Sequence, residues 1–296
     1  MTMRSRDIRF AFFGTPAIAV AALDALEAQG LIPALIVTQP DRAAGRGHAL
    51  IAPPVKEWAL ARGIDVLQPE KLDDAFIGEL ANTEWDAFAL VAYGALLPAA
   101  LLSIPRHGTL NMHPSLLPKL RGPSPITSAI LTDEHPTGVT VMLIDEKMDH
   151  GPVLAQEVIE VTEWPPKRRE LEELLAAEGG ALLAETLPLW VAGTIEAAPQ
   201  DDAAATYCAK VKKEDGLLDL AGDPALALRK IRAFDGWPGT YAFFERAGKT
   251  LRVQILEAHA DPDGSLAIDT VKPEGKGAMP YADFLRSGAV PSARAK

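Results

Sequence analysis

Residues 111–122 read NMHPSLLPKLRG, and Asn111 and His113 have types and a spacing that could perform chemistry. If the residues before His113 form a strand, side chains two positions apart project from the same face. Histidine acts as a general acid or base near neutral pH, and an asparagine amide can donate to a developing oxyanion. The pair therefore predicts a catalytic site. The alternative is a loop histidine bonded to backbone beside a turn asparagine.

A carboxylate would complete such a site by orienting the imidazole or by assisting proton transfer. Two candidates, Asp145 and Asp149, lie in DEKMDHG, which follows the strand-like run TGVTVMLI at 137–144. Either could equally be an ordinary turn aspartate, the common role of Asp near Gly. Residue types and spacing leave the choice between the two open.

Other chemistries lack their motifs. Ser115 is not in a G-x-S-x-G elbow, and the histidines and aspartates have no tight metal-ligand spacing. The first predicted strand ends in GTPAIA without G-x-G-x-x-G, and GRG at 45–47 is not placed as a phosphate loop would be. Cys208 is the single cysteine, which excludes an intramolecular disulfide and fits a reducing compartment. We expect a site that uses no metal and no nucleotide.

Alternating elements would position these residues. Apolar runs predict strands at 8–13, 31–38, 87–94, 108–113 and 137–144, with helices at 17–30 and 52–63 between the first of them. Strands that are apolar throughout, alternating with helices, indicate a parallel sheet covered on both faces. Ligands bind such sheets at the carboxyl ends of the strands. A further strand is expected at 153–161 and a long helix at 167–193.

The N-terminal segment and the second part of the chain complete the outline. Gly14 and Pro16 interrupt the first apolar run, so strand, turn and helix explain it better than a signal peptide. No uninterrupted apolar run is long enough for a membrane span, and we expect a cytoplasmic protein. Residues 196–208 are polar and alanine-rich and read as a connector. Beyond them, a helix at 223–234 and strands at 240–245 and 250–258 indicate a small β-rich domain.

The net charge of −11 argues by itself against a nucleic-acid partner, but it is distributed unevenly. Residues 201–296 hold 14 Lys and Arg against 14 Asp and Glu, while residues 1–200 hold 15 against 26. The second part of the chain is therefore neutral and contains short basic patches. Charge alone leaves a nucleic-acid partner open.

The motifs resemble a known family. NMHPSLLPKLRGPSPI at 111–126, followed by TGVTVMLIDEKMDHGPVLAQ at 137–156, is similar to the signature of the folate-dependent formyltransferases. FFGTPAIAVAALDAL, VTQPDRAAGRG, ATYCAKVKKEDGLLDL, KIRAFDGWPGTY and VKPEGKGAMPYADFLRSG resemble, within it, the methionyl-tRNA formyltransferase family. The likeness runs from about residue 8 to about residue 288 and is thinnest near 256–270.

The resemblance implies a fold and a reaction. The fold would be a Rossmann-like catalytic domain at 1–195, a linker at 196–208 and an OB-like β-barrel domain at 209–296, shortened near 257–271. The chain would be a metal-independent monomer that transfers the formyl group of 10-formyltetrahydrofolate to the α-amine of initiator methionyl-tRNA. The alternatives are a small amine acceptor such as an amino sugar, a non-catalytic tRNA or folate binder, and a hydrolase that releases formate.

The resemblance also implies roles for residues. The catalytic set would be Asn111, His113 and Asp149, which prefers Asp149 over Asp145. The folate donor would be bound by Ser115, Leu116, Leu117, Pro118, Tyr93 and Gly94. The tRNA would be bound by Arg42, Arg46, Lys210, Lys212, Lys213, Arg229 and Arg232. The sequence HAL at 48–50 stands where the family usually has lysines, so a weaker basic loop is expected there.

Overall fold

The computed structural model of the chain describes residues 8–44 and 49–292. They form two compact units, each described here by itself. Unit 1 consists of the described residues up to 122 together with 136–160 and 173–207. Unit 2 consists of 123–135, 161–172 and the described residues from 208 on. The domain boundaries inferred from the sequence remain a prediction, and the contacts add that two segments before residue 195 pack within unit 2.

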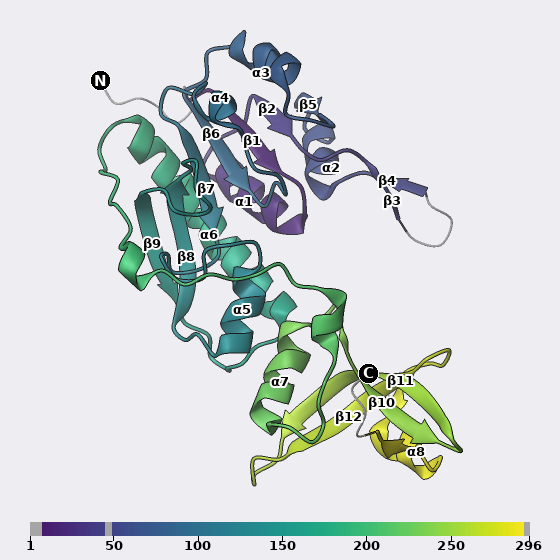
Figure 1. Ribbon diagram of the computed structural model, residues 1–296. Helices are drawn as coiled ribbons and strands as arrows, with labels where there is room; N and C mark the ends of the chain where they lie inside the picture. Colours follow the sequence, from purple (N-terminus) through teal and green to yellow (C-terminus); the bar gives the residue numbers. More distant parts are fainter. Residues whose placement is uncertain (1–7, 45–48, 293–296) are drawn as a thin grey trace. The chain divides into compact units, whose positions relative to one another are not determined.

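Unit 1 is built on a seven-stranded sheet with the strand order β5-β2-β1-β6-β7-β8-β9 (Figure 1). The strands are β1 (Phe10–Gly14), β2 (Leu35–Val37), β5 (Val66–Leu67), β6 (Ala87–Val91), β7 (Thr109–His113), β8 (Thr137–Leu143) and β9 (Val153–Ile159). The first five are parallel to one another, which confirms a largely parallel, Rossmann-like sheet. β1 and β7 are buried along their whole length, because both faces of the sheet are covered.

The expectation that the run at 137–144 is parallel to the others is wrong. β8 pairs antiparallel with β7, and β9 pairs antiparallel with β8. An apolar strand buried on both faces has the same composition whichever way it runs, so its sequence does not report its direction. The helix between β7 and β8, α5 (Pro125–Thr132), packs in unit 2 against α7 (Pro224–Ala233) and so does not form the crossover that parallel strands require.

Helices cover the two faces of the sheet. On one face lie α1 (Ala17–Ala28) and the part of α6 (Arg168–Val191) that belongs to unit 1. A Cβ on Gly179 of α6 would lie 2.8 Å from the Met112 sulfur of β7, and one on Gly180 would lie 2.9 Å from Ala22 of α1. On the other face, α3 (Asp74–Ala81) and α4 (Ala99–Leu102) pack their apolar side chains against Phe13 and Phe88. Unit 1 also contains α2 (Pro54–Leu60).

Among the described residues, α6 is the one helix long and apolar enough to cross a membrane by length and composition. Half of its most apolar window is buried inside the protein. Leu175 and Leu183 are fully buried, and Gly179 packs on Met112. The helix therefore serves as a core helix of unit 1.

Several elements are too short to show a hydrophobic periodicity from which a helix or strand could be predicted. They include α3, α4, β5 and the antiparallel hairpin of β3 (Arg42–Ala44) and β4 (Ala49–Ile51). The residues between β3 and β4, 45–48, lie outside the described part. α3 has a local signal in retrospect, because the Asp73 carboxylate accepts a hydrogen bond from the Phe76 amide at its N-terminus.

Unit 2 contains a five-stranded antiparallel sheet with the order β13-β12-β11-β10-β14. Its elements are β10 (Thr240–Arg246), β11 (Lys249–Ala260), β12 (Leu266–Pro273), β13 (Met279–Pro280), α8 (Tyr281–Arg286) and β14 (Val290–Pro291). Burial alternates along β10, as expected for a sheet with one covered face. The rings of Phe244 and Phe284 meet edge to face at 5.1 Å in the core. The segment 257–271, which from the resemblance is shorter than usual in the family, forms the paired ends of β11 and β12 and the turn that joins them.

Candidate active site at the end of strand β7

Asn111 and His113 lie in the last three residues of β7 and share one face of the sheet. They are 7% and 5% exposed, and the intervening Met112 packs toward α6 on the opposite face. Among the residues that the structure describes, none hydrogen-bonds to the Asn111 side chain. The Asn111 amide is therefore available to a ligand.

The His113 imidazole is held by main chain. Its Nε2 lies 3.0 Å from the carbonyl oxygen of Leu120. A carbonyl oxygen only accepts, so Nε2 carries the proton, and in the neutral ring Nδ1 is left as an acceptor. Burial lowers the pKa of His113, against the opposing effects of the Asp149 carboxylate and of the hydrogen bond to Leu120. The imidazole is thus neutral at neutral pH, with Nδ1 able to take up a proton.

Asp149 lies next to this nitrogen, with its Oδ1 3.8 Å from Nδ1 of His113. That distance allows an electrostatic interaction but exceeds a hydrogen bond. The other carboxylate oxygen accepts a hydrogen bond of 2.7 Å from the Gly122 amide. Asp149 has a φ of 48°, a left-handed conformation that costs roughly 1–3 kcal/mol in a residue other than glycine. Such a conformation persists only where neighbouring contacts hold it.

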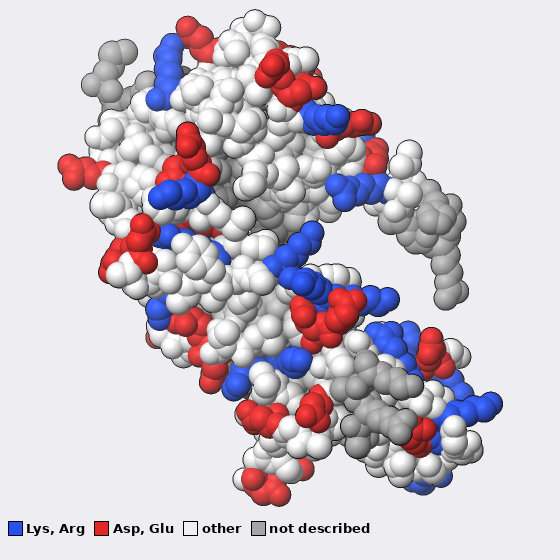
Figure 2. Space-filling model, viewed as in Figure 1, with Lys and Arg blue, Asp and Glu red and all other residues white. Residues whose placement is uncertain are grey.

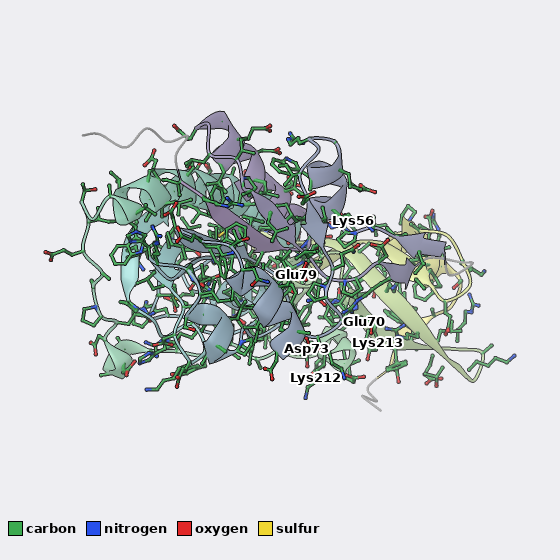
Figure 3. All side chains as sticks on the ribbon, turned by 90° about the horizontal axis from the view of Figure 1, so that it is seen from above. Lys56, Glu70, Asp73, Glu79, Lys212 and Lys213 are labelled. Atoms are coloured by element: carbon green, nitrogen blue, oxygen red, sulfur yellow. The ribbon has the colours of Figure 1, made fainter. Side chains whose placement is uncertain are left out.

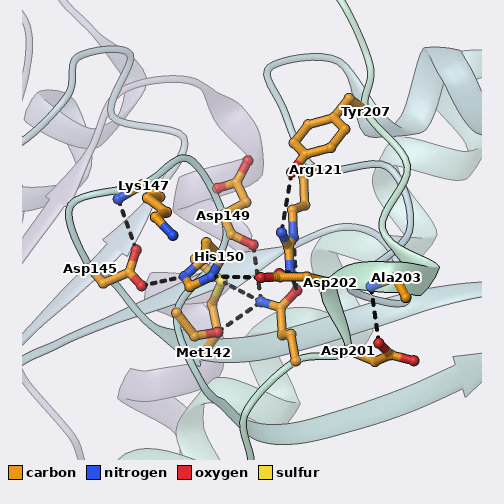
Figure 4. A network of polar contacts seen from close by, with 12 residues as sticks. Arg121, Met142, Asp145, Lys147, Asp149, His150, Asp201, Asp202, Ala203 and Tyr207 are labelled. Atoms are coloured by element: carbon orange, nitrogen blue, oxygen red, sulfur yellow. Dashed lines mark hydrogen bonds and ion pairs between the residues drawn. The ribbon is translucent and has the colours of Figure 1, made fainter.

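Asp145, the other candidate, is occupied elsewhere. Its carboxylate lies 2.6 Å from Nδ1 of His150 and accepts from the Lys147 amide at 2.9 Å (Figure 4). The geometry therefore favours Asp149 over Asp145. Because β8 is antiparallel, its last residue Leu143 pairs with Leu110 rather than lying beside His113. The loop after β8 brings Asp149 back, and it turns at Gly151, where a Cβ would lie 1.8 Å from the Leu143 carbonyl oxygen.

The segment expected to bind the folate donor is a tightly bonded turn. The Ser115 hydroxyl donates to the Lys119 carbonyl at 2.7 Å and so closes the turn. Ser115 and Leu117 are buried, and Leu116 and Pro118 are half-buried. The side chains that fix this turn from outside are Thr140 of β8 and Gln156 of β9.

Sequence reasoning missed Thr140 and Gln156. The Thr140 hydroxyl donates to the Ser115 carbonyl at 2.7 Å and accepts from the Leu117 amide at 3.1 Å. The Gln156 amide donates to the Leu117 carbonyl at 2.9 Å. For Thr140, which is fully buried, the available signal was a polar residue inside an otherwise apolar strand, because such a residue requires a partner. Gln156 is exposed on β9 beside Glu157, so nothing in its sequence context signalled the contact.

Tyr93 and Gly94 follow β6, beside the point where the strand order reverses between β1 and β6. The Tyr93 ring is 1% exposed and packs edge to face with Phe13 at 5.6 Å, and burial raises its pKa to about 12. Its side chain therefore contributes to the core. The backbone beside it turns sharply: Ala92 and Gly94 have φ of 49° and 90°, and the Tyr93 carbonyl accepts from the Thr15 hydroxyl at 3.0 Å.

The residues expected to bind tRNA have different surroundings. Lys210, Lys212 and Lys213 are exposed in unit 2 (the last two are labelled in Figure 3), and within the described residues none of them forms an ion pair. Arg42 is exposed on β3, 3.4 Å from the Gln39 side chain, and Arg46 lies outside the described residues.

The two arginines of α7 are less accessible. Arg229 lies 3.7 Å from Asp133 with its side chain 23% exposed, and its buried Nε lacks a partner among the described residues. Arg232 is half-buried. Lys56, a further cation near the hairpin, bonds to Asp41 at 2.8 Å. On the face shown in Figure 2, basic and acidic side chains are interspersed.

No group of three or more His, Cys, Asp and Glu side chains within 8–44 and 49–292 could hold a metal ion. The expected independence from metals remains a prediction.

The chain was compared with known protein families and with individual proteins. Residues 8–187 match the formyl transferase family. The chain is 45% identical over 267 residues to a methionyl-tRNA formyltransferase of Chloroflexus aurantiacus, covering 89% of this chain and 84% of that protein. It is 40% identical over 306 aligned positions to a methionyl-tRNA formyltransferase of Acidobacterium capsulatum, covering 96% and 97%.

Solved structures show the same fold at low identity. An N-formyltransferase from Helicobacter canadensis, in complex with folinic acid and dTDP-3-aminofucose, is 17% identical with a TM-score of 0.63, over 86% of this chain and 89% of that one. HypX from Aquifex aeolicus in complex with tetrahydrofolic acid is 18% identical with a TM-score of 0.61, over 94% and 47%. These likenesses concern the fold alone, whereas the matches at 40–45% identity extend over most of both chains. The chain belongs to the formyl transferase family and, within it, to the methionyl-tRNA formyltransferases.

Proposed function

We propose that the protein transfers the formyl group of 10-formyltetrahydrofolate to the α-amine of initiator methionyl-tRNA in the cytoplasm, in support of translation initiation. The observation that carries the proposal is the end of β7. There, an Asn111 amide without a hydrogen-bond partner among the described residues and the acceptor nitrogen of His113 share one face, and Asp149 lies 3.8 Å from that nitrogen. The choice of methionyl-tRNA as the acceptor rests on the names of the relatives at 40–45% identity.

The residues present fit a formyl donor. An amide donor without a hydrogen-bond partner among the described residues suits a carbonyl oxygen that becomes negative as its carbon is attacked. The turn at 115–118 and the backbone of 92–94 would hold the folate portion, the first fixed by Thr140 and the second by Thr15. Bound there, the donor supplies an activated formyl carbonyl. No metal is needed for that step.

The catalytic residues then have separate roles. A free α-amino group has a pKa near 8, so a neutral fraction of the α-amine is present at physiological pH. Asn111 donates to the formyl oxygen as negative charge develops on it. The attacking amine loses a proton to Nδ1 of His113, whose other nitrogen stays bonded to Leu120. Asp149 stabilises the imidazolium that results. The imidazolium then gives its proton to the leaving nitrogen of the donor as the bond between that nitrogen and the formyl carbon breaks.

The test is formyl transfer from 10-formyltetrahydrofolate, followed by acid-gel mobility of the tRNA and by release of tetrahydrofolate. Four acceptor conditions are compared: methionyl initiator tRNA, the same tRNA uncharged, a dTDP-amino sugar, and no acceptor. Transfer to charged tRNA alone is the expected result. Preferential transfer to the amino sugar, or formate release at the same rate without any acceptor, would overturn the assignment in favour of a small-amine transferase or a hydrolase.

A further inference from the structure

A segment with no assigned catalytic part lies against the site. Residues 198–207, read from sequence as part of a linker, form a strap on unit 1. Ala198 exchanges two main-chain hydrogen bonds of 2.8 Å with Val153 of β9. At the other end, the Thr206 carbonyl accepts from the Arg121 amide at 2.9 Å, and the Thr206 hydroxyl accepts from the Leu120 amide at 2.8 Å. The strap is thus bonded to the residues that adjoin the catalytic set.

Leu120, Arg121 and Gly122 connect the strap to that set. The Leu120 carbonyl accepts from His113, and the Gly122 amide donates to Asp149. Between them, Arg121 is 1% exposed and directs its guanidinium to the strap. There it donates to the Gln200 side-chain oxygen from Nε at 3.0 Å and from Nη2 at 2.8 Å, and to Asp202 at 2.9 Å.

Gln200 closes the connection. Its amide nitrogen donates to the carbonyls of Asp149 at 3.0 Å and Gly151 at 2.7 Å. Because a guanidinium only donates and a carbonyl only accepts, the amide of Gln200 can satisfy these four contacts in one orientation alone. Both hydrogens of its nitrogen and both lone pairs of its oxygen are used. The surrounding polar contacts are shown in Figure 4.

These contacts form a closed ring. Gly122 donates to the Asp149 carboxylate, the Asp149 carbonyl accepts from Gln200, and Gln200 accepts from Arg121, which is bonded covalently to Gly122. Asp149 is therefore held both at its side chain and at its main chain, which accounts for its left-handed φ of 48°. We propose that Gln200, oriented by Arg121, is a positioning residue that fixes the Asp149 carboxylate against His113.

The predicted effect on kcat rests on the proposed function, whereas the predicted effect on the pKa of His113 does not. Gln200→Leu has nearly the volume of the wild-type side chain and lacks both donors. We expect kcat to fall about 10- to 100-fold, with KM for the folate donor within about twofold, because a displaced catalytic group loses mainly transition-state stabilisation. We also expect the pKa of His113, followed by NMR, to move downward toward its value in Asp149→Asn.

Two further variants provide a second test of Gln200 and a control for stability. Gln200→Glu keeps the oxygen that faces Arg121 but removes the donors to the two carbonyls, so its effect on kcat should be at least as large. Thr186→Val removes a buried hydroxyl that bonds the Leu182 carbonyl within α6, and should lower Tm without moving kcat or the His113 pKa. Thr186→Val thus controls for loss of stability.

An unchanged His113 pKa in a folded Gln200→Leu protein would overturn the positioning role, as would a kcat within twofold of wild type. If the wild-type protein fails to formylate charged tRNA, the proposed function fails. The NMR measurement still decides the positioning role in that case, because it needs no acceptor.

Discussion

At the end of β7 the His113 imidazole is almost fully buried, whereas the ammonium groups of Lys212 and Lys213 in unit 2 are exposed. One contact of 3.0 Å to Leu120 orients the imidazole, and its pKa is lowered by burial. The two lysines have no ion pair among the described residues. Catalysis on this chain depends on a few atoms held in place, while binding of a polyanion depends on the sum of many weak, mobile charges.

The difference predicts effects of different size. His113→Ala removes the proton acceptor from the buried region, and we expect kcat for formyl transfer to fall by about two orders of magnitude or more, since loss of a preorganised group of this kind costs roughly 3–4 kcal/mol. The fold should persist, as judged by circular dichroism and donor binding. Turnover near the wild-type rate would remove His113 from the mechanism.

A titration examines the buried region more closely. The pKa of His113 should lie below its ordinary value of 6.5, and it should fall further in Asp149→Asn, because the carboxylate opposes the effect of burial. Between the lowered pKa of the folded state and the ordinary value of 6.5, the unfolded state binds the proton more readily than the folded state does. The free energy of unfolding should therefore decline as pH falls from about 6.5 through the folded-state pKa, and this contribution should be complete above 6.5.

The measurement is NMR titration of the imidazole signals, assigned by their absence in His113→Gln. A pKa above 6.5, or an increase on replacing Asp149, would contradict the neutral imidazole that the mechanism uses.

The smallest effect is expected in the exposed region. Lys212→Ala with Lys213→Ala should raise KM for charged tRNA a few-fold at moderate salt and leave kcat unchanged. If both lysines contact phosphates, the slope of log affinity against log salt should become shallower by about two units, since each contact contributes roughly one. Lys71→Ala, an exposed lysine of unit 1, is the matched control. Equal salt slopes in the wild type and the double variant would assign these lysines to a solvated surface.

Arg229 shows where composition misleads. From sequence it is one basic residue among several on the helix at 223–234, and the resemblance assigns it to tRNA. In the structure it is paired with Asp133 at the end of α5 and only 23% exposed. Lys56 is similarly occupied by Asp41. A sequence records that a charge exists, but its partner is contributed by a segment distant in the chain.

The sequence by itself determined the local features of this protein. Apolar runs defined the long strands and helices, the i, i+2 spacing placed Asn111 and His113 on one face, and the motifs at 111–126 and 137–156 indicated the family. These features depend on a few neighbouring residues and on the period of the backbone. They could therefore be predicted without knowing any distant contact.

Only the tertiary structure decided the rest. The direction of β8, the route by which Asp149 approaches His113, and the use of Leu120, Arg121 and Gln200 to hold them all depend on residues distant in the chain. Hydrogen bonds to main-chain carbonyls and amides leave almost no mark on composition, because every residue offers the same groups. Which residue supplies them is fixed by the packing of the whole unit.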